Sequence, residues 1–268
     1  MGVLREISGK GIRLSHSLDK MPKKDDFESH IHDNYELFCL VRGDVDYIVE
    51  GNLYKLHSGA IMLMRSSETH RLIVNKSTEY ERYVLNFSPS VILSAGVSQD
   101  ILAPYRARAL GERNMYKEGE LFGTSAIACL EKAFENSKYI EPRDAILSSL
   151  LSLLCDILRA FNEKGDGTER SEPYREIISY VNENLTTDIT IEKIASHMHV
   201  SPTQASRIFK SATGASVHSY IIAKRLILFN KKLARGKGVI EACHECGFRD
   251  YSSFYRLYKK RFGKAPTQ

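Results

Sequence analysis

The last hundred residues of the chain contain an internal repeat with an offset of 49 residues. Arg207, Phe209, Lys210 and Gly214 return as Arg256, Tyr258, Lys259 and Gly263. Upstream of each copy lie a short apolar segment, a tight turn (MHVS in the first copy, CGFRD in the second) and a helix-start signal. A duplicated helix–turn–helix explains this spacing, because each copy rebuilds the same short helix, turn and second helix.

Capping residues divide this region into six or seven predicted helices. Serine, threonine and aspartate favour helix starts because their side chains accept hydrogen bonds from the first backbone N–H groups, and glycine favours helix ends. The expected starts are Pro173, Thr190, Ser201 with Pro202, Ser216, Val239 and Asp250, and the expected ends are Gly214, Gly236, Gly247 and Gly263. The C-terminal domain is therefore predicted to be all-helical over 172–268.

The charge of the chain is concentrated in this helical part. Residues 169–268 hold 17 Lys+Arg against 9 Asp+Glu, a net charge of +8, whereas residues 1–168 hold 21 against 24, a net charge of −3; together they give the +5 of the whole chain. A basic domain built from helix–turn–helix units favours double-stranded DNA as its partner. Two such units bridged by a rigid helix can occupy successive major grooves, roughly 34 Å apart.

The candidate DNA contacts follow from helical position. In a helix–turn–helix, the second helix presents its N-terminal residues to the edges of the bases. We expect Ala205, Ile208 and Phe209 to be buried in the first copy, and Phe254 and Leu257 in the second. The predicted DNA-facing residues are Thr203, Ser206, Arg207 and Lys210 in the first copy, and Tyr251, Ser252, Tyr255, Arg256 and Lys259 in the second. Arginine can contact guanine, whereas lysine suits phosphates.

These C-terminal residues resemble the AraC/XylS family of transcription regulators. The segment CGFRDYSSFYRLYKKRFGKAP follows the family signature, and IEKIASHMHVSPTQASRIFKSATGAS and KRLILFNKKL match the first unit and the connecting helix. The chain departs from the family at Phe229 and Cys243, where alanine is usual, and at His199, where glycine is usual. The resemblance implies DNA binding by the last hundred residues.

The run Cys243-His244-Glu245-Cys246 contains a CxxC pattern, which also occurs in zinc and redox sites. The sequence holds no second CxxC. Both cysteines fall where the repeat buries small apolar residues. We therefore interpret them as core residues.

The N-terminal part has the pattern of a β-structure. Segments such as YELFCLV and EYERYVLNF are rich in β-branched and aromatic residues, and DYIVEGNLYKL indicates a hairpin with Gly51-Asn52 at its tip. Short strands over about 7–88 predict an antiparallel barrel or sandwich. Residues 1–20 are expected, by analogy with look-alike folds, to form an arm that closes over the barrel as a lid.

Helices are predicted from about 89 to 161. The stripe Ile146, Leu150, Leu153, Ile157 and Phe161 has helical period, with a second row at 147, 151, 154 and 158. Two interpretations stay open: one row covers the barrel while the other forms a homodimer, or the helix simply packs on its own barrel. The polar segment 162–171, NEKGDGTERS, is the predicted linker, so that 1–165 forms the sensing and dimerisation domain.

The stretch HIHDNYE, residues 30–36, has the spacing of a binding site. His30, His32 and Glu36 share parity, so an extended strand directs all three side chains to one face. The pattern HxHxxxE followed by Gly43 resembles the first motif of the cupin barrels, and HSGAIMLMRSSETH, ending at His70, resembles the second. In metal-using cupins the positions of His30, His32, Glu36 and His70 bind one transition metal.

Three interpretations of this cluster remain open. The four residues bind a divalent transition metal, they edge a pocket for an organic effector, or they are structural remnants. Regulators similar to AraC commonly have cupin-like sensor domains that hold a small molecule without a metal. The resemblance therefore implies effector binding by His30, His32, Glu36 and His70, with no cofactor required.

Composition limits the remaining classes of function. The five cysteines are an odd number, which disfavours a disulfide framework and fits a reducing compartment. The N-terminus lacks a signal-peptide pattern, and the longest apolar tract, AILSSLLSLLCDIL, is too short to span a bilayer. We expect a cytoplasmic protein without membrane contact. Motifs of hydrolases, nucleotide-binding proteins and dehydrogenases are absent from the sequence.

The sequence thus predicts an α+β two-domain transcription regulator rather than an enzyme. A cupin-like barrel with flanking helices would sense a small molecule, with a sugar or glycoside as the leading guess, and the helical domain would bind an operator. The resemblance implies activation and contact with RNA polymerase, whereas the expected homodimer rests on the apolar stripe over 146–161. The alternatives are a metal-dependent cupin oxygenase or isomerase fused to a DNA-binding domain, and a constitutive nucleoid-type binder.

Overall fold

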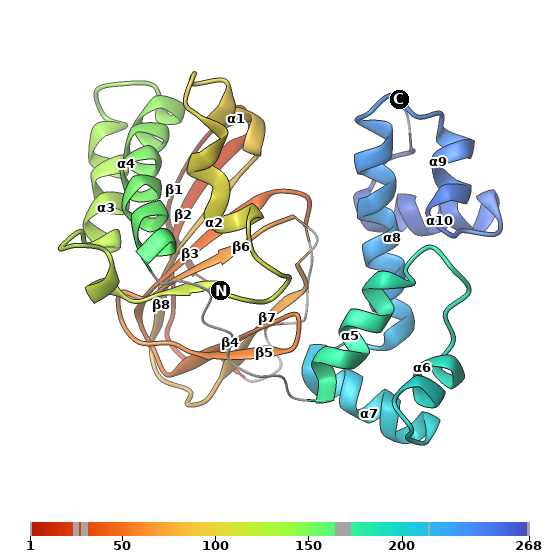
Figure 1. Ribbon diagram of the computed structural model, residues 1–268. Helices are drawn as coiled ribbons and strands as arrows, with labels where there is room; N and C mark the ends of the chain where they lie inside the picture. The colour runs from red at the N-terminus through yellow and green to blue at the C-terminus, as the bar shows by residue number, and fades with distance from the viewer. Residues whose placement is uncertain are drawn as a thin grey trace. The chain divides into compact units, whose positions relative to one another are not determined.

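A computed structural model describes residues 2–23, 27, 32–66, 68–163, 173–213 and 215–266 of the chain. The chain divides into two compact units, Met1–Glu169 and Arg170–Gln268, and each is described by itself. The first combines antiparallel sheets with helices, and the second contains helices (Figure 1). The predicted α+β architecture, with a sheet-rich N-terminal part and a helical C-terminal part, is confirmed.

Antiparallel strands dominate the first unit. Its strands are β1 (Gly2–Gly9), β2 (Ile12–Asp19), β3 (Tyr35–Arg42), β4 (Val45–Val49), β5 (Asn52–Lys55), β6 (Ile61–Met64), β7 (His70–Val74), β8 (Tyr80–Phe87) and β9 (Met115–Tyr116). Its helices are α1 (Pro89–Leu93), α2 (Ala103–Arg106), α3 (Ala126–Asn136) and α4 (Pro142–Glu163), with short 3-10 turns η1 (Gln99–Leu102) and η2 (Glu118–Glu120). Strand β9 lies within the stretch predicted to be helical, because it pairs with β6.

The strands form a six-stranded sheet of order β1-β2-β8-β3-β6-β9 and a three-stranded sheet of order β5-β4-β7. The prediction that residues 1–20 form a lid is wrong. Strand β1 pairs with β2, and β2 pairs with β8 from Ile12 opposite Phe87 to Asp19 opposite Tyr80. Backbone hydrogen bonds hold this hairpin in the large sheet, where the β-structure begins at Gly2 rather than at residue 7.

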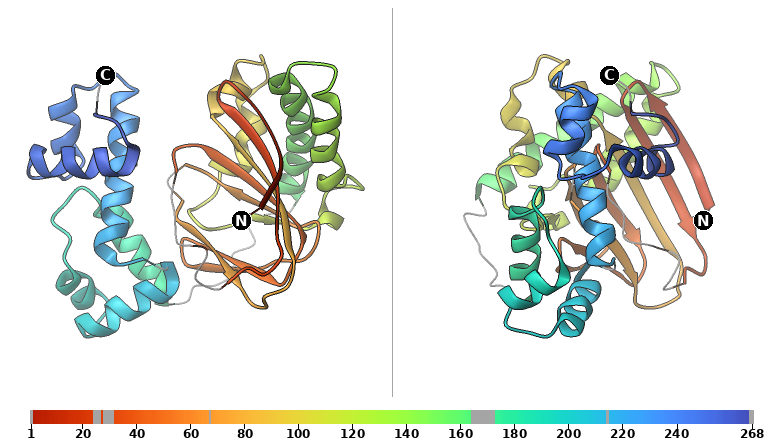
Figure 2. Two further views of the ribbon diagram at one scale, coloured as in Figure 1. Left: turned by 180° about the vertical axis from the view of Figure 1, so that it is seen from behind. Right: turned by 90° about the vertical axis from the view of Figure 1, so that its right-hand side faces the viewer.

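Strand β3 is buried on both of its faces, and this divides the unit into layers. Leu37 and Cys39 belong to an apolar core that includes residues of the flanking helices. Phe38 and Leu40 belong to a second core, which includes residues of β4 and β7 from the small sheet. Successive side chains of a strand point to opposite faces, so the large sheet has the helices on one face and the small sheet on the other (Figures 1 and 2).

Helix α4 packs on its own domain. The predicted stripe is buried, and Leu150 has no exposed surface; Leu147 and Leu154 of the second row are buried as well. Leu151 packs partly buried against the same core. This arrangement favours the interpretation in which the helix covers its own sheet, and the homodimer stays a prediction. The helix continues to Glu163, two residues into the predicted linker, and residues 164–172 lie outside the described residues.

The hairpin between β4 and β5 turns one residue earlier than predicted. Val49 pairs with Asn52, so the two-residue turn is Glu50-Gly51 rather than Gly51-Asn52. Both turn residues have positive φ, 48° and 88°. This is the conformation that matches the twist of a tight hairpin. The buried Glu50 carboxylate accepts a hydrogen bond from the Thr69 backbone N–H at 2.5 Å, which ties this turn to the residue before β7.

The second unit contains α5 (Pro173–Glu183), α6 (Ile191–His197), α7 (Pro202–Thr213), α8 (Val217–Leu233), α9 (Val239–Glu245) and α10 (Tyr251–Phe262). Helices α5, α6 and α7 share one apolar core with the beginning of α8, where Tyr220 and Ile221 are buried. Helices α9 and α10 share another with the rest of α8, through Leu226 and Phe229. The connecting helix therefore contributes to both helix–turn–helix units (Figure 1).

Most of the predicted caps are present. The side chains of Thr190, Ser201, Ser216 and Asp250 accept hydrogen bonds from backbone N–H groups at the starts of α6, α7, α8 and α10. Gly263 ends α10 with a φ of 69°, whereas the predicted end at Gly214 lies outside the described residues. His199, which replaces the usual turn glycine, has a φ of 54° and thus adopts the left-handed conformation of a glycine.

Candidate functional site

The predicted contact residues of the first helix–turn–helix lie on one exposed face of α7. Thr203, Ser206, Arg207 and Lys210 are all exposed, whereas Ala205 and Phe209 are buried in the first core. Ile208, which was expected to be buried, is only half-buried. Spacings of three and four residues place the exposed side chains on adjacent turns. The face therefore offers two cations and two hydroxyls to a ligand.

Helix α10 presents a similar face with more aromatic character. Ser252, Arg256 and Lys259 are exposed, while Tyr251 and Tyr255 are half-buried with ring centroids 6.3 Å apart. Leu257 is half-buried rather than buried. The phenol rings add apolar surface beside the cations. Such surface suits contacts with thymine methyl groups or sugars, whereas Lys259 suits phosphate.

The second core fixes the orientation of α10. Phe254 packs on Phe229 with ring centroids 4.5 Å apart, and the Tyr258 hydroxyl donates to Asn230 Oδ1 at 2.9 Å. The Arg256 guanidinium donates to Ser253 Oγ at 3.3 Å, which orients this exposed cation along the helix. Sequence reasoning missed Ser253 as a positioning group. Its spacing of three residues from Arg256 was the available signal.

The CxxC cysteines are part of the second core. Cys243 and Cys246 are buried beside Phe254 and Tyr258. Burial raises the pKa of the Cys243 thiol and raises that of the Cys246 thiol to about 11. Metal binding and thiol exchange both need the thiolate, so at neutral pH these side chains are suited to packing.

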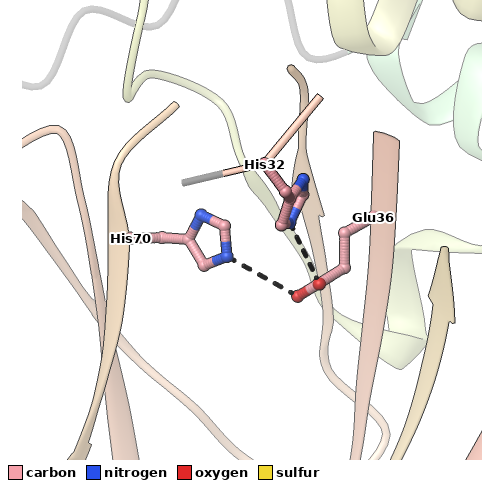
Figure 3. A group of neighbouring side chains, drawn as sticks. All are labelled: His32, Glu36 and His70. Atoms are coloured by element: carbon pink, nitrogen blue, oxygen red, sulfur yellow. Dashed lines mark hydrogen bonds and ion pairs between the residues drawn. The ribbon is translucent and has the colours of Figure 1, made fainter. Parts of the chain in front are cut away.

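In the first unit, the structure brings together His32, Glu36 and His70 (Figure 3). His32 Nε2 lies 3.2 Å from Glu36 Oε2, and His70 Nε2 lies 3.8 Å from Glu36 Oε1. Glu36 comes from β3 and His70 from the start of β7, so the cluster joins the two sheets. Glu36 and His70 are buried, and His32 is half-buried. The fourth predicted residue, His30, lies outside the described residues.

Backbone carbonyls orient both imidazole rings. His32 Nδ1 lies 2.8 Å from the Asn34 carbonyl oxygen, and His70 Nδ1 lies 2.9 Å from that of Glu68. A carbonyl oxygen only accepts, so each Nδ1 carries the proton and donates it. Both Nε2 atoms are therefore directed to the Glu36 carboxylate. Metal-binding histidines are commonly oriented by such a bond from the other ring nitrogen.

The electrostatics of the cluster depend on Glu36. Burial lowers the pKa of His32, but the hydrogen bond and negative charge of Glu36 outweigh it and raise this pKa above the ordinary value of 6.5. Burial, together with the charge of Glu36, also raises the pKa of the neighbouring Tyr47 phenol well above its usual range. One potential ligand atom from each of the three residues lies within 4.8 Å of the others. Imidazole nitrogens and a carboxylate oxygen are donor types that divalent transition ions accept, with bonds of about 2.1 Å, so these atoms would have to move closer together to hold one ion.

Sequence reasoning did not identify Tyr47, which lies beside this cluster, or the buried Arg82, Asp19 and Tyr80 of the same unit. The ring of His70 stacks near Tyr47 at 6.1 Å and lies edge-on to His32 at 4.9 Å. The Arg82 guanidinium forms a buried ion pair with Asp19 at 2.6 Å and lies 4.4 Å from the centre of the Tyr80 ring. In the sequence, the only signal for Tyr47, Tyr80 and Arg82 was that they alternate with outward-facing residues in β4 and β8.

Comparison with known proteins identifies both halves of the chain. The model of the AraC-like ligand binding domain matches residues 18–178, and that of a helix-turn-helix domain matches residues 194–268. The probable transcriptional regulator LumQ of Photobacterium leiognathi is 31% identical over 131 residues, which cover 47% of this chain and 52% of LumQ. The HTH-type transcriptional activator RhaS of Mannheimia succiniciproducens is 21% identical over 94% of this chain and 92% of its own length.

The solved structure of ToxT from Vibrio cholerae is similar over 96% of this chain and 96% of its own chain, with 14% identity and a TM-score of 0.41. Among the described residues, no helix combines the length and the apolar character needed to cross a bilayer. Because the ligand-domain model covers more than half of the chain and a helix-turn-helix domain follows it, the chain belongs to the AraC family of transcriptional regulators.

Proposed function

We propose that the chain binds an operator with α7 and α10 and that a small-molecule effector held in the first unit controls this binding. The observation that carries the proposal is the matched pair of exposed faces, each with an arginine and a lysine one turn apart, on the second helices of the two helix–turn–helix units. An effector that binds two arrangements of the chain with different affinity would shift the population between them.

The recognition residues are tested with the double variant Arg207→Ala, Arg256→Ala. A base contact by arginine contributes about 1–3 kcal/mol, so removing two is expected to weaken specific binding by about 30-fold or more. The probe is a duplex selected from a random library with the wild-type chain, and the assay is fluorescence anisotropy at physiological salt. The double variant Lys76→Ala, Lys138→Ala removes the same charge from exposed positions of the first unit. Equal binding by wild type and the arginine variant would refute the assignment.

The other aspects of the function rest on resemblance and on the sequence. Activation is supported by the relative named as a transcriptional activator, RhaS, and it would require contact with RNA polymerase. A sugar or glycoside effector, a homodimer, a cytoplasmic location and the lack of enzymatic activity are further parts of this proposal. Light scattering on the full chain, with and without the selected duplex, tests the homodimer. An assay of transcription with candidate glycosides tests the effector.

A second candidate function is metal sensing by the cluster of His32, Glu36 and His70. It is favoured by the two Nδ1–carbonyl bonds that direct both Nε2 atoms to one carboxylate. Imidazole and carboxylate together suit Fe(II), Mn(II), Ni(II), Cu(II) or Zn(II). A metal-dependent oxygenase or isomerase would use the same ligands, so turnover must be tested separately from binding.

The metal is measured by plasma mass spectrometry on untagged protein. About one ion per chain in wild type, lost in His32→Ala, His70→Ala and retained in the exposed-histidine control His57→Ala, His218→Ala, would support a metal site. A change in operator affinity on adding that ion would then support sensing. No ion in any variant would leave the cluster as the edge of an organic effector pocket or as a structural pair.

A further inference from the structure

Helix α8 is the one element that both helix–turn–helix units share among the described residues, and a single side chain on it contacts both. Arg225 lies between the part of α8 buried in the first core and the part buried in the second. Its Nε donates to the Leu185 carbonyl at 2.8 Å, and one terminal nitrogen donates to the Thr187 carbonyl at 2.6 Å. The other terminal nitrogen donates to the Gly247 carbonyl at 2.8 Å.

These carbonyls belong to different units. Leu185 and Thr187 lie in the connection from α5 to α6, whereas Gly247 lies in the turn from α9 to α10. A guanidinium holds its donors in a rigid planar fork. Three bonds from one such fork therefore fix the position of the α5–α6 connection relative to the turn that leads into α10.

Two further contacts cross the same junction. Gly247 has a φ of 82°, and a Cβ built on it would lie only 2.7 Å from the Thr186 carbonyl oxygen, so the two backbones touch there. Arg249, at the end of the same turn, forms an ion pair with Asp188 at 2.7 Å. Exposed ion pairs contribute little to stability, and both of these side chains are largely exposed, at 80% and 57%.

The junction combines polar groups with apolar side chains such as Ile222, Phe248 and Leu257. Beside Arg225 lies an open groove of about 620 Å³, bordered by residues of the α5–α6 connection, the α9–α10 turn and α10. Among the described residues, the two apolar clusters that flank α8 have no member in common. The relative position of the two units thus depends on α8 itself and on the contacts around Arg225, among which are its three hydrogen bonds to backbone carbonyls.

We propose that Arg225 is a positioning residue for DNA recognition, which sets the spacing at which α7 and α10 can bind their two half-sites together. This inference rests on the proposed function, in which both helices enter the major groove. Two linked binding modules gain about 10²–10⁴ in affinity from simultaneous binding, and they lose that gain when their geometry does not match the target. Arg225 keeps the geometry matched to one spacing.

The test compares affinity for three duplexes derived from the selected site: the full site, one half-site alone, and the full site with about 5 base pairs, half a helical turn, inserted between the halves. For wild type we expect the second half-site to raise affinity about 100-fold and the insertion to remove most of this gain. In Arg225→Ala we expect the gain to fall to about tenfold or less and the penalty of insertion to shrink with it. Affinity for one half-site should stay within about threefold.

The matched control is Arg235→Ala, which removes one positive charge from an exposed position just after α8. It should keep the wild-type gain and the wild-type spacing penalty. Arg225→Lys keeps the charge but lacks the planar fork, so it should follow Arg225→Ala in its spacing tolerance. Circular dichroism melts establish that each variant is folded, and the lysine variant carries the test if the alanine variant is not.

The binding data distinguish a failure of the role of Arg225 from a failure of two-groove binding. A wild-type gain that persists undiminished in Arg225→Ala and Arg225→Lys would overturn the role of Arg225 while leaving two-groove binding intact. A wild-type chain that gains nothing from the second half-site would overturn two-groove binding and the role of Arg225 together. A smaller gain with broader spacing tolerance in both Arg225 variants, and not in Arg235→Ala, would support the proposal.

Discussion

The buried ion pair between Glu68 and Arg108 is expected to be the most sensitive polar contact of the first unit. Both side chains are fully buried, and the two carboxylate oxygens lie 2.5 and 2.8 Å from the two terminal nitrogens of Arg108. The carboxylate also accepts from the backbone N–H groups of Arg65 and Gly111 and from the Asn114 side chain. The pair joins residues 40 positions apart and anchors the segment that precedes His70.

We predict that Glu68→Gln lowers the free energy of unfolding by about 3–5 kcal/mol, because it leaves the buried Arg108 charge without its counter-ion. Native domains are stable by only about 5–15 kcal/mol, so this loss is a large fraction. The double variant Glu68→Met, Arg108→Met should recover most of it, since replacing a whole buried pair by apolar side chains is often neutral. Glu118→Gln, at an exposed position of the same unit, should cost less than about 0.5 kcal/mol.

The same pair predicts a pH dependence. Burial raises the pKa of Glu68, but the charge of Arg108 and the hydrogen bonds outweigh it and hold this pKa below its ordinary value of 4.5. A lowered pKa contributes stability that is fully present above 4.5 and is lost as the pH falls through the lower, folded value. Wild type should thus lose more stability below about pH 4.5 than Glu68→Gln does.

The assay is urea unfolding of the full chain, followed by hydrogen-exchange mass spectrometry on peptides from β6 and β7, which assigns the transition to the first unit. A cost below about 1 kcal/mol for Glu68→Gln, or identical acid dependence in both proteins, would refute the reasoning.

Four other changes have definite expected outcomes. Phe254→Ala empties the centre of the second core and should cost about 3–5 kcal/mol in urea unfolding; a cost under about 1 kcal/mol would contradict the packing of α10 on α8. Ser201→Ala removes the cap of α7 and should cost about 1 kcal/mol, whereas Ser201→Thr should cost less. His199→Gly should raise stability by about 0.5–1 kcal/mol by relieving the left-handed backbone, and a loss of stability would speak against strain at this turn. The raised pKa of His32 contributes stability that is present below its ordinary value of 6.5 and lost as the pH rises through the folded value, so His32→Gln should flatten the fall in stability from about pH 6 to pH 8 that we expect of wild type in urea unfolding.

The features of the helical unit that could be predicted are those that depend on neighbouring residues. Thr190, Ser201 and Asp250 cap their helices as expected, because a cap is a contact across two or three positions. The exposed faces of α7 and α10 followed from helical period in the same way. Arg225 was not identified, since its partners lie 22 to 40 positions away and only the packed structure brings them together.

In the first unit, the features that the sequence did not predict depend on contacts between residues far apart in the chain. The segment GVLREISG shows little alternation of polar and apolar residues. It forms β1 because its backbone pairs with the edge of β2. The sequence predicted that His32 and Glu36 lie together, but the predicted reason is wrong: His32 precedes β3, and bends at residues 33 and 34 separate it from the strand that carries Glu36. The position of His70 near them was expected by resemblance alone. The hydrogen bonds that orient the two imidazoles are accepted by the backbone carbonyls of Asn34 and Glu68, and the pattern of side chains in the sequence does not predict them.

The two buried faces of β3 have a consequence for how such a sensor can diversify. Glu36 points to the cluster with His32 and His70, whereas Leu37 and Cys39 are held in the helical core. Because alternate positions face opposite sides, a substitution at Glu36 changes the chemistry of the cluster and leaves the helical core on the other face of β3 in place. Phe38 and Leu40, which follow on the face of Glu36, are buried in the second core, so Glu36 near the start of the strand is the position of β3 at which a response to a new molecule can be engineered.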